Sequence, residues 1–193
     1  MAALANPIRF PVFGYGSNGI EQLRVRCQNP NLTSVKAHMK DHVRIFSGRA
    51  VSRQNGAVAS IAPMQGGNVY GSVVFLTQAE MHLLDVREGV ISSNPTDTST
   101  NRAYRRVQVT VWVGNVERQD CYTYIRNKKL WVTGGGANFN GKPSPQYLTR
   151  IKNHVEEHWT DPAGVTITIR KPNLETVEEW SVSTNIILWF FLL

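Results

Sequence analysis

With 193 residues, of which 41% are hydrophobic, the chain is long enough for one globular domain with a proper core and shorter than two domains usually need. The formal net charge of +7 suits an anionic ligand, but lysine and arginine are spread along the chain without a basic stripe interleaved with aromatic residues, which argues against a nucleic-acid partner. The two cysteines, Cys27 and Cys121, fit neither a metal knuckle nor a disulfide framework, and residues 1–9 lack a signal-peptide pattern, so a cytoplasmic location is expected.

The first predicted element is a strand over residues 10–14, which runs into the turn Tyr15–Asn18 and then into a helix from Ile20 onward. Glycines on either side of Tyr15 let the backbone turn sharply, and Ser17 or Asn18 can cap the first helical turn. Unpaired N–H groups at such a helix start converge, which suits an oxyanion or a carboxylate. A capped connection without a ligand is the commoner role of such a turn, so alone it indicates a binding site only weakly.

Strands dominate the next part of the chain. Two short strands are expected after the first helix, of which residues 43–46 form the clearer one by their alternation. Residues 57–62 and 69–76 are rich in β-branched side chains and predict two buried strands, separated by Gly66 and Gly67.

A second helix is predicted from Thr77, whose hydroxyl can form a capping box with Glu80, to a stop at Gly89. Residues 92–101 are polar and predict a loop. The alternating valines of residues 104–113 then predict a strand.

The following segments complete the predicted fold. Residues 121–125 are expected to pair antiparallel with the preceding strand, and the glycine-rich residues 131–143 predict a loop of the length that often serves as a lid. Ser144 caps a last helix with apolar residues at helical spacing, and residues 165–169 predict one more strand. Many strands with three helices indicate an α+β fold, a small and mostly antiparallel β-barrel with flanking helices.

We expect one domain over residues 1–172 and a C-terminal extension over residues 173–193. The extension ends in an apolar run over residues 186–193, which is too short to cross a membrane, because a span needs about 20 residues. A final strand, a partner-binding tail and a misassigned reading frame all remain open for this run.

Four blocks of the sequence carry a family resemblance. They are the turn Tyr15–Asn18, the segment Leu84–Val90, Tyr104, and the segment Pro143–Tyr147. In order and approximate spacing they resemble the gamma-glutamylcyclotransferase family, over about residues 13–159. The resemblance implies the same small β-barrel and an enzyme that cyclises a γ-glutamyl amino acid or peptide to 5-oxoproline with release of the free amine.

The resemblance also implies partners. It implies a small γ-glutamyl substrate, no metal or organic cofactor, no nucleic acid and no membrane span, and it leaves a homodimer open. γ-Glutamyl amino acids, glutathione and γ-glutamyl-ε-lysine are the candidate substrates, and the turn with the Ser-Pro-Gln-Tyr block favours the first.

Glu88 is the candidate catalytic residue. It ends a predicted helix, where the partial negative charge of the helix macrodipole should raise the pKa of a carboxyl, and a raised pKa suits a general base and acid. An exposed charge at a helix end is the commoner role of such a glutamate. The resemblance implies that Glu88 is the acid–base residue.

The resemblance marks a further set of residues as substrate-binding: Tyr15, Gly16, Ser17, Asn18, Gly19, Ile20, Tyr104 and Tyr147. Gly19 departs from the family, which usually has a leucine there, and the loops over residues 92–101 and 131–142 are long, so substrate choice is more open than reaction type.

Two alternatives compete with this hypothesis. His154, Glu157 and His158 fit a His-x-x-Glu-His zinc-hydrolase pattern, but on a helix both histidines would flank an apolar stripe, which favours a structural role. The second alternative is a non-catalytic binding module on the same fold.

Overall fold

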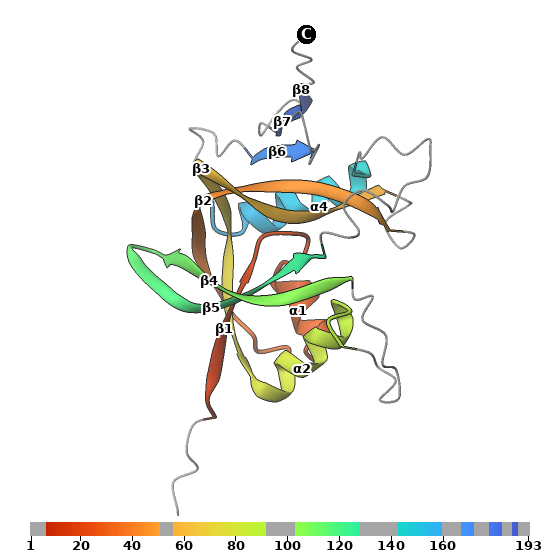
Figure 1. The fold of residues 1–193 in the computed structure, drawn as a ribbon. Coiled ribbons are helices and arrows are strands. Elements are labelled where there is room, and N and C mark those ends of the chain that lie inside the picture. Colours follow the sequence, from red (N-terminus) through yellow and green to blue (C-terminus); the bar gives the residue numbers. More distant parts are fainter. Residues whose placement is uncertain are drawn as a thin grey trace, which may run out of the picture.

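The computed structural model describes residues 7–50, 56–91, 103–127 and 143–159, together with three short strands at 167–171, 178–182 and 187–188. Within these ranges five strands close into a barrel, and three helices flank it (Figure 1). The barrel strands are β1 (Arg9–Gly14), β2 (Ser34–Ala50), β3 (Gly56–Thr77), β4 (Tyr104–Val113) and β5 (Val116–Arg126).

The barrel strands follow the order β3-β1-β5-β4-β2, and a pairing between β2 and β3 closes the ring. Of these pairs, β1 with β5 is parallel and the other four are antiparallel. The predicted α+β class, with a mostly antiparallel β-barrel, is therefore confirmed.

β2 and β3 are longer than predicted, since each spans what the sequence pattern divided into two strands. Gly66 and Gly67 therefore do not separate two strands. Their place is a local irregularity, where the register of β2 shifts between Lys40 and His42 and Asp41 has a positive φ of 54°. Asp41 Oδ1 accepts a hydrogen bond from the Gly66 N–H at 2.8 Å, which stabilises a bulged bend in a continuous two-stranded ribbon.

The helices are α1 (Ile20–Arg26), α2 (Gln78–Arg87) and α4 (Pro145–Glu156). The predicted caps of two of them are confirmed: Thr77 and Glu80 form a capping box at α2, and Ser144 Oγ accepts the Tyr147 N–H at α4. The predicted cap of α1 is wrong, because Gly19 is its N-cap and no side chain caps it. Gly89, with φ of 67°, follows the end of α2 as predicted.

The remaining predictions concern the second half of the chain. β4 and β5 pair antiparallel as expected, although β5 begins at Val116 rather than at Cys121. β6 (Ile167–Lys171) overlaps the strand predicted at 165–169, and β7 (Glu178–Val182) and β8 (Ile187–Leu188) extend the sheet beyond it. Loop residues 92–101 and 131–142 lie outside the described residues, as does the apolar tail except for β8.

Two hydrophobic clusters hold the fold together. One fills the barrel with side chains such as Phe13, Val73 and Cys121. The other joins α1 and α2 to the barrel wall through Leu23 and Leu84 among others. Figure 1 shows α1 and α2 together at one end of the barrel, whereas α4 lies against β2 and β3. No helix in the described ranges is both long and apolar enough to span a membrane.

Replacing Gly71 with alanine tests the close approach of β3 to the end of β1. A Cβ at position 71 would lie 2.0 Å from the backbone oxygen of Gly14, and no side-chain rotation can relieve that overlap. We expect Gly71→Ala to lower the free energy of unfolding by roughly 1–3 kcal/mol, the usual range for overpacking. Urea unfolding measures the change.

Gly16→Ala is the matched control for stability. A Cβ there would meet nothing closer than the Ala59 Cβ at 3.7 Å, an ordinary van der Waals distance. Its unfolding free energy should stay near that of the wild type, and equal losses in both variants would contradict the proposed packing.

Candidate active site

A pocket of about 320 Å³ opens where the end of β1, the end of α2 and the start of α4 meet. It is lined by residues far apart in the sequence, which come from the turn after β1, from the barrel strands and from all three helices: Phe13, Gly14, Tyr15, Gly16, Ser17, Asn18, Arg26, Val58, Ala59, Val86, Arg87, Glu88, Gly89, Ala103, Tyr104, Thr123, Tyr124, Arg126 and Tyr147. The four sequence blocks that carry the family resemblance therefore meet at one place.

The turn Tyr15–Asn18, here called the opening turn, lines this pocket. Its carbonyl groups are bound within the protein: Arg44 Nε donates to the Tyr15 oxygen at 2.8 Å, and His154 Nδ1 donates to the Gly16 oxygen at 2.6 Å. The backbone N–H groups of Ser17 and Asn18 donate to no other residue among those described. Because both residues line the pocket, these donors can bind an anion there.

Of the two side chains that bind the opening turn, Arg44 is charged and His154 is neutral. Burial lowers the pKa of Arg44 to about 10, so the guanidinium stays charged at neutral pH, and it also donates to the Tyr70 oxygen at 2.7 Å. Burial lowers the pKa of His154 to about 4, so its ring is neutral. With Nδ1–H bound to Gly16, Nε2 accepts from the Ser72 hydroxyl at 2.8 Å.

The same contacts weigh against the zinc alternative. Both ring nitrogens of His154 are bound to protein groups, and the Nε2 of His158 pairs with Ser34 Oγ at 2.7 Å. Glu157 lies beside the start of α1, where its Oε2 accepts the Ile20 N–H at 3.4 Å. The three side chains of the His-x-x-Glu-His pattern thus bind three different parts of the protein instead of converging.

Glu88 reaches the pocket from the C-cap of α2, and its side chain is 11% exposed. Its Oε1 accepts a hydrogen bond from Asn18 Nδ2 at 2.8 Å and forms an ion pair with Arg26. The expected proximity of Glu88 and the opening turn is therefore present in the structure. These two donors come from parts of the chain distant in sequence, so the residues around Glu88 do not indicate them.

The two other predicted tyrosines bind the backbone of one residue on β3. Tyr104 donates its hydroxyl to the Ala59 oxygen, and the Tyr147 hydroxyl accepts the Ala59 N–H, both at 3.1 Å. Tyr15 donates its hydroxyl to the Tyr124 oxygen at 2.6 Å. Burial raises the pKa of Tyr15 and Tyr104, so both phenols are neutral donors at physiological pH.

Two of the predicted binding residues lie outside the pocket. Gly19 and Ile20 begin α1, and a Cβ on Gly19 would lie 2.6 Å from Glu157 Oε1. Glu157 Oε1 is the end of an exposed, flexible side chain, and the next nearest atom, His154 Cβ, is 3.4 Å away, so a larger residue at position 19 requires mainly that the Glu157 side chain shifts. Two arginines that the sequence pattern does not mark, Arg26 and Arg126, also reach the pocket, from the ends of α1 and β5, and no local motif surrounds either of them.

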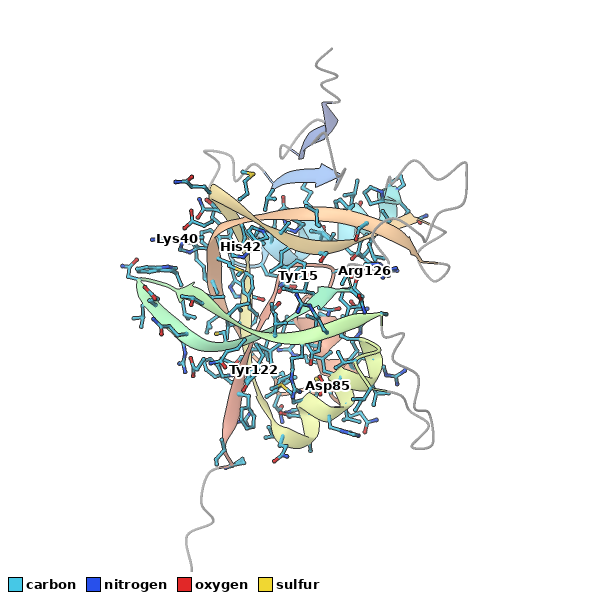
Figure 2. The ribbon with its side chains drawn as sticks, in the orientation of Figure 1. Tyr15, Lys40, His42, Asp85, Tyr122 and Arg126 are labelled. Carbon is cyan, nitrogen blue, oxygen red and sulfur yellow. The ribbon has the colours of Figure 1, made fainter. Side chains whose placement is uncertain are left out.

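A buried network supports the last turn of α2, on which Glu88 depends. Asp85 Oδ2 forms an ion pair with Arg106 at 2.5 Å, and its Oδ1 accepts the Tyr124 hydroxyl at 2.8 Å. Figure 2 shows Asp85 on α2, below Tyr15 and Arg126, which lie between the β2–β3 layer and the α1–α2 pair. The network fixes the end of α2 to β4 and β5.

The chain resembles known proteins in both sequence and structure. A sequence model of the family described as "Gamma-glutamyl cyclotransferase, AIG2-like" matches residues 12–143, more than half of the chain. The fold is similar to the crystal structure of an uncharacterized protein from Homo sapiens, with 25% identity and a TM-score of 0.61, over 80% of this chain and 82% of that chain. It is also similar to a solved structure called gamma-glutamyl cyclotransferase, with 25% identity and a TM-score of 0.60, over 78% and 80% of the two chains. No curated protein sequence matches it.

His154→Gln should reduce the dependence of stability on pH. The pKa of His154 is about 4 in the folded protein and 6.5 for the ordinary side chain, so below pH 6.5 the unfolded state binds more protons. The stability that depends on the neutral ring is complete above pH 6.5 and is lost as the pH falls towards 4. Between pH 7.5 and pH 5 this loss amounts to about 2 kcal/mol.

Urea unfolding at both pH values measures the effect. The wild type should lose about 2 kcal/mol more than His154→Gln between these pH values. An equal loss in the wild type and in His154→Gln would show that the buried ring does not carry this dependence.

Proposed function

This chain belongs to the gamma-glutamyl cyclotransferase, AIG2-like family, and we propose that it cyclises a γ-glutamyl amino acid or peptide to 5-oxoproline with release of the free amine. The observation that carries this proposal is the contact between Glu88 and Asn18, which puts a carboxylate beside a turn with unpaired N–H donors in one pocket. A carboxylate and anion-binding N–H groups are the two elements that this reaction needs from a protein.

The reaction is intramolecular. The α-amino nitrogen of the glutamyl group attacks its own γ-carbonyl carbon, so a C–N bond forms and the carbonyl oxygen becomes an oxyanion. The tetrahedral intermediate collapses with cleavage of the bond to the leaving nitrogen. The attacking nitrogen, an ammonium at the start, gives up two protons in all, and the leaving amine takes both and departs as an ammonium.

Glu88 would relay these protons and end the cycle ionised as it began. Its contacts with Asn18 and Arg26 hold the carboxylate in the pocket, ready to accept the first proton. No cofactor is needed in this mechanism, because nucleophile and electrophile belong to one molecule and are already close.

The remaining pocket residues would hold the glutamyl group. The Ser17 and Asn18 N–H groups can donate to the developing oxyanion or to a substrate carboxylate. Tyr104 and Tyr147 also line the pocket, where both bind the backbone of Ala59. The volume of about 320 Å³ suits a small ligand such as a γ-glutamyl amino acid, which we propose as the substrate in preference to γ-glutamyl-ε-lysine.

Glu88→Gln tests the catalytic role. Glutamine keeps the shape of the side chain but cannot accept the ammonium proton at neutral pH, so 5-oxoproline release should fall by at least about 10²-fold. The loss should appear in kcat at saturating substrate, because a proton relay acts after the substrate is bound. The assay follows 5-oxoproline release from γ-glutamyl-alanine, glutathione and γ-glutamyl-ε-lysine.

Glu21→Gln is the control for this variant, since Glu21 is an exposed carboxylate of α1 whose side chain pairs with Arg24. It should retain wild-type turnover. Near wild-type turnover in folded Glu88→Gln would exclude the mechanism, and no turnover of any substrate by the wild type would favour the non-catalytic binding module.

A further inference from the structure

Arg26 is a pocket residue to which the mechanism above gives a contact with Glu88 but none with the substrate. It is the last residue of α1, its side chain is 18% exposed, and it forms the ion pair with Glu88. Arg26 and Glu88 both line the pocket, so an oppositely charged pair faces any ligand that enters.

We propose that Arg26 binds the α-carboxylate of the γ-glutamyl substrate while Glu88 receives its α-ammonium group. This inference rests on the proposed function and adds a substrate-binding residue to it. The substrate would exchange ion pairs with the protein: its carboxylate pairs with the guanidinium, and its ammonium pairs with the carboxylate.

The adjacency of the two side chains is the main argument. In an α-amino acid the ammonium nitrogen and the carboxylate are attached to the same carbon atom, so their receptors must also be neighbours. Arg26 and Glu88 are in direct contact. Arg126, the other arginine with its side chain deep in the pocket wall, lies over the ring of Tyr104, with its guanidinium 5.7 Å from the ring centroid.

The hydrogen bonds of the pair leave suitable atoms for the substrate. Both donors to Glu88, Asn18 Nδ2 and Arg26, contact the same oxygen, Oε1. Among the described residues nothing donates to Glu88 Oε2, so this oxygen can accept from the ammonium. Arg26 contacts Glu88 through one terminal nitrogen, and no other acceptor for its guanidinium occurs in the described ranges. A guanidinium has five N–H donors, which leaves enough for a carboxylate.

The proposed role of Arg26 also determines which anion the opening turn binds. If Arg26 binds the α-carboxylate, the N–H groups of Ser17 and Asn18 serve the oxyanion that forms on the γ-carbonyl oxygen. The two anionic positions of the reaction are then bound by different groups, a charged side chain for the permanent charge and backbone donors for the transient charge.

The test compares two substrates on three proteins. The substrates are γ-glutamyl-alanine and its analogue with a carboxamide in place of the glutamyl α-carboxylate. We expect the wild type to prefer the carboxylate in kcat/KM by about 10- to 100-fold, the range for a hydrogen bond to a charged group. Arg26→Gln should bring this preference to within about threefold, mainly through KM for the carboxylate substrate.

Arg24→Gln is the matched control, because Arg24 lies on the same helix and pairs with a glutamate, Glu21, but does not line the pocket. It should keep the wild-type preference. Arg26→Lys keeps the charge and should restore part of the preference, which a merely structural role would not require. It also replaces Arg26→Gln as the test variant if the glutamine variant does not fold.

A carboxylate preference that survives in folded Arg26→Gln would overturn the proposal, as would a preference that disappears in Arg126→Gln instead. A loss of kcat in Arg26→Gln that is equal for both substrates would also overturn it, because Arg26 would then only hold Glu88.

Calorimetric binding separates this proposal from the proposed function. The wild type should bind glutamate, which carries both charges of the α-amino acid, more tightly than isoglutamine, in which a carboxamide replaces the α-carboxylate, and Arg26→Gln should bind the two alike. If no γ-glutamyl substrate is turned over, the proposed function fails, yet this comparison still decides the role of Arg26. Equal binding of both compounds by the wild type would overturn it.

Discussion

The hold of Arg44 and His154 on two carbonyl oxygens of the opening turn is the interaction on which the site depends. A buried carbonyl without a donor is costly, and a buried guanidinium without acceptors is more so. Here the buried donors and the buried carbonyl oxygens satisfy each other. Arg44 donates to the oxygens of Tyr15 and Tyr70, and neutral His154 donates to the oxygen of Gly16. Because Arg44 lies on β2 and His154 on α4, the turn is fixed to two elements that follow it in the chain.

Glu88 is fixed by an equivalent arrangement on the other side of the pocket. The capping box at Thr77 defines the start of α2, and the contacts of Asp85 with Arg106 and Tyr124 fix its end. The carboxylate therefore sits on a rigid helix end, and the donors it faces sit on a rigid turn. Catalysis by positioned groups needs this kind of preorganisation, which neither element could supply alone.

The sequence predicted those features that are set by local chemistry. The capping box at α2, the Ser144 cap of α4 and the stop of α2 at Gly89 all follow from residues within a few positions of one another. Ser17 or Asn18 is the cap that the local sequence predicts for α1, but Gly19 is the N-cap and the Asn18 amide is bound to Glu88, 70 residues away. The local sequence does not indicate Arg26 as a pocket residue either, because its ion-pair partner Glu88 is 62 residues away. β2 and β3 were divided in two because a glycine pair marks a bulge as readily as a loop.

The ion pair in the pocket also bears on the energetics of binding. A charged substrate must lose water when it enters a small pocket, and so must the protein groups that receive it. Arg26 and Glu88 are already largely withdrawn from water, with side chains 18% and 11% exposed, and they compensate each other's charge before any ligand arrives. Most of the free-energy cost of their desolvation is therefore part of folding and not of binding.

A zwitterion that replaces one ion pair by two leaves no charge unmatched, whereas a ligand with only one of the two charges would leave either Arg26 or Glu88 buried without a partner. The pair would thus favour a zwitterion, such as the amino-acid end of the proposed γ-glutamyl substrate, over singly charged ligands of the same size.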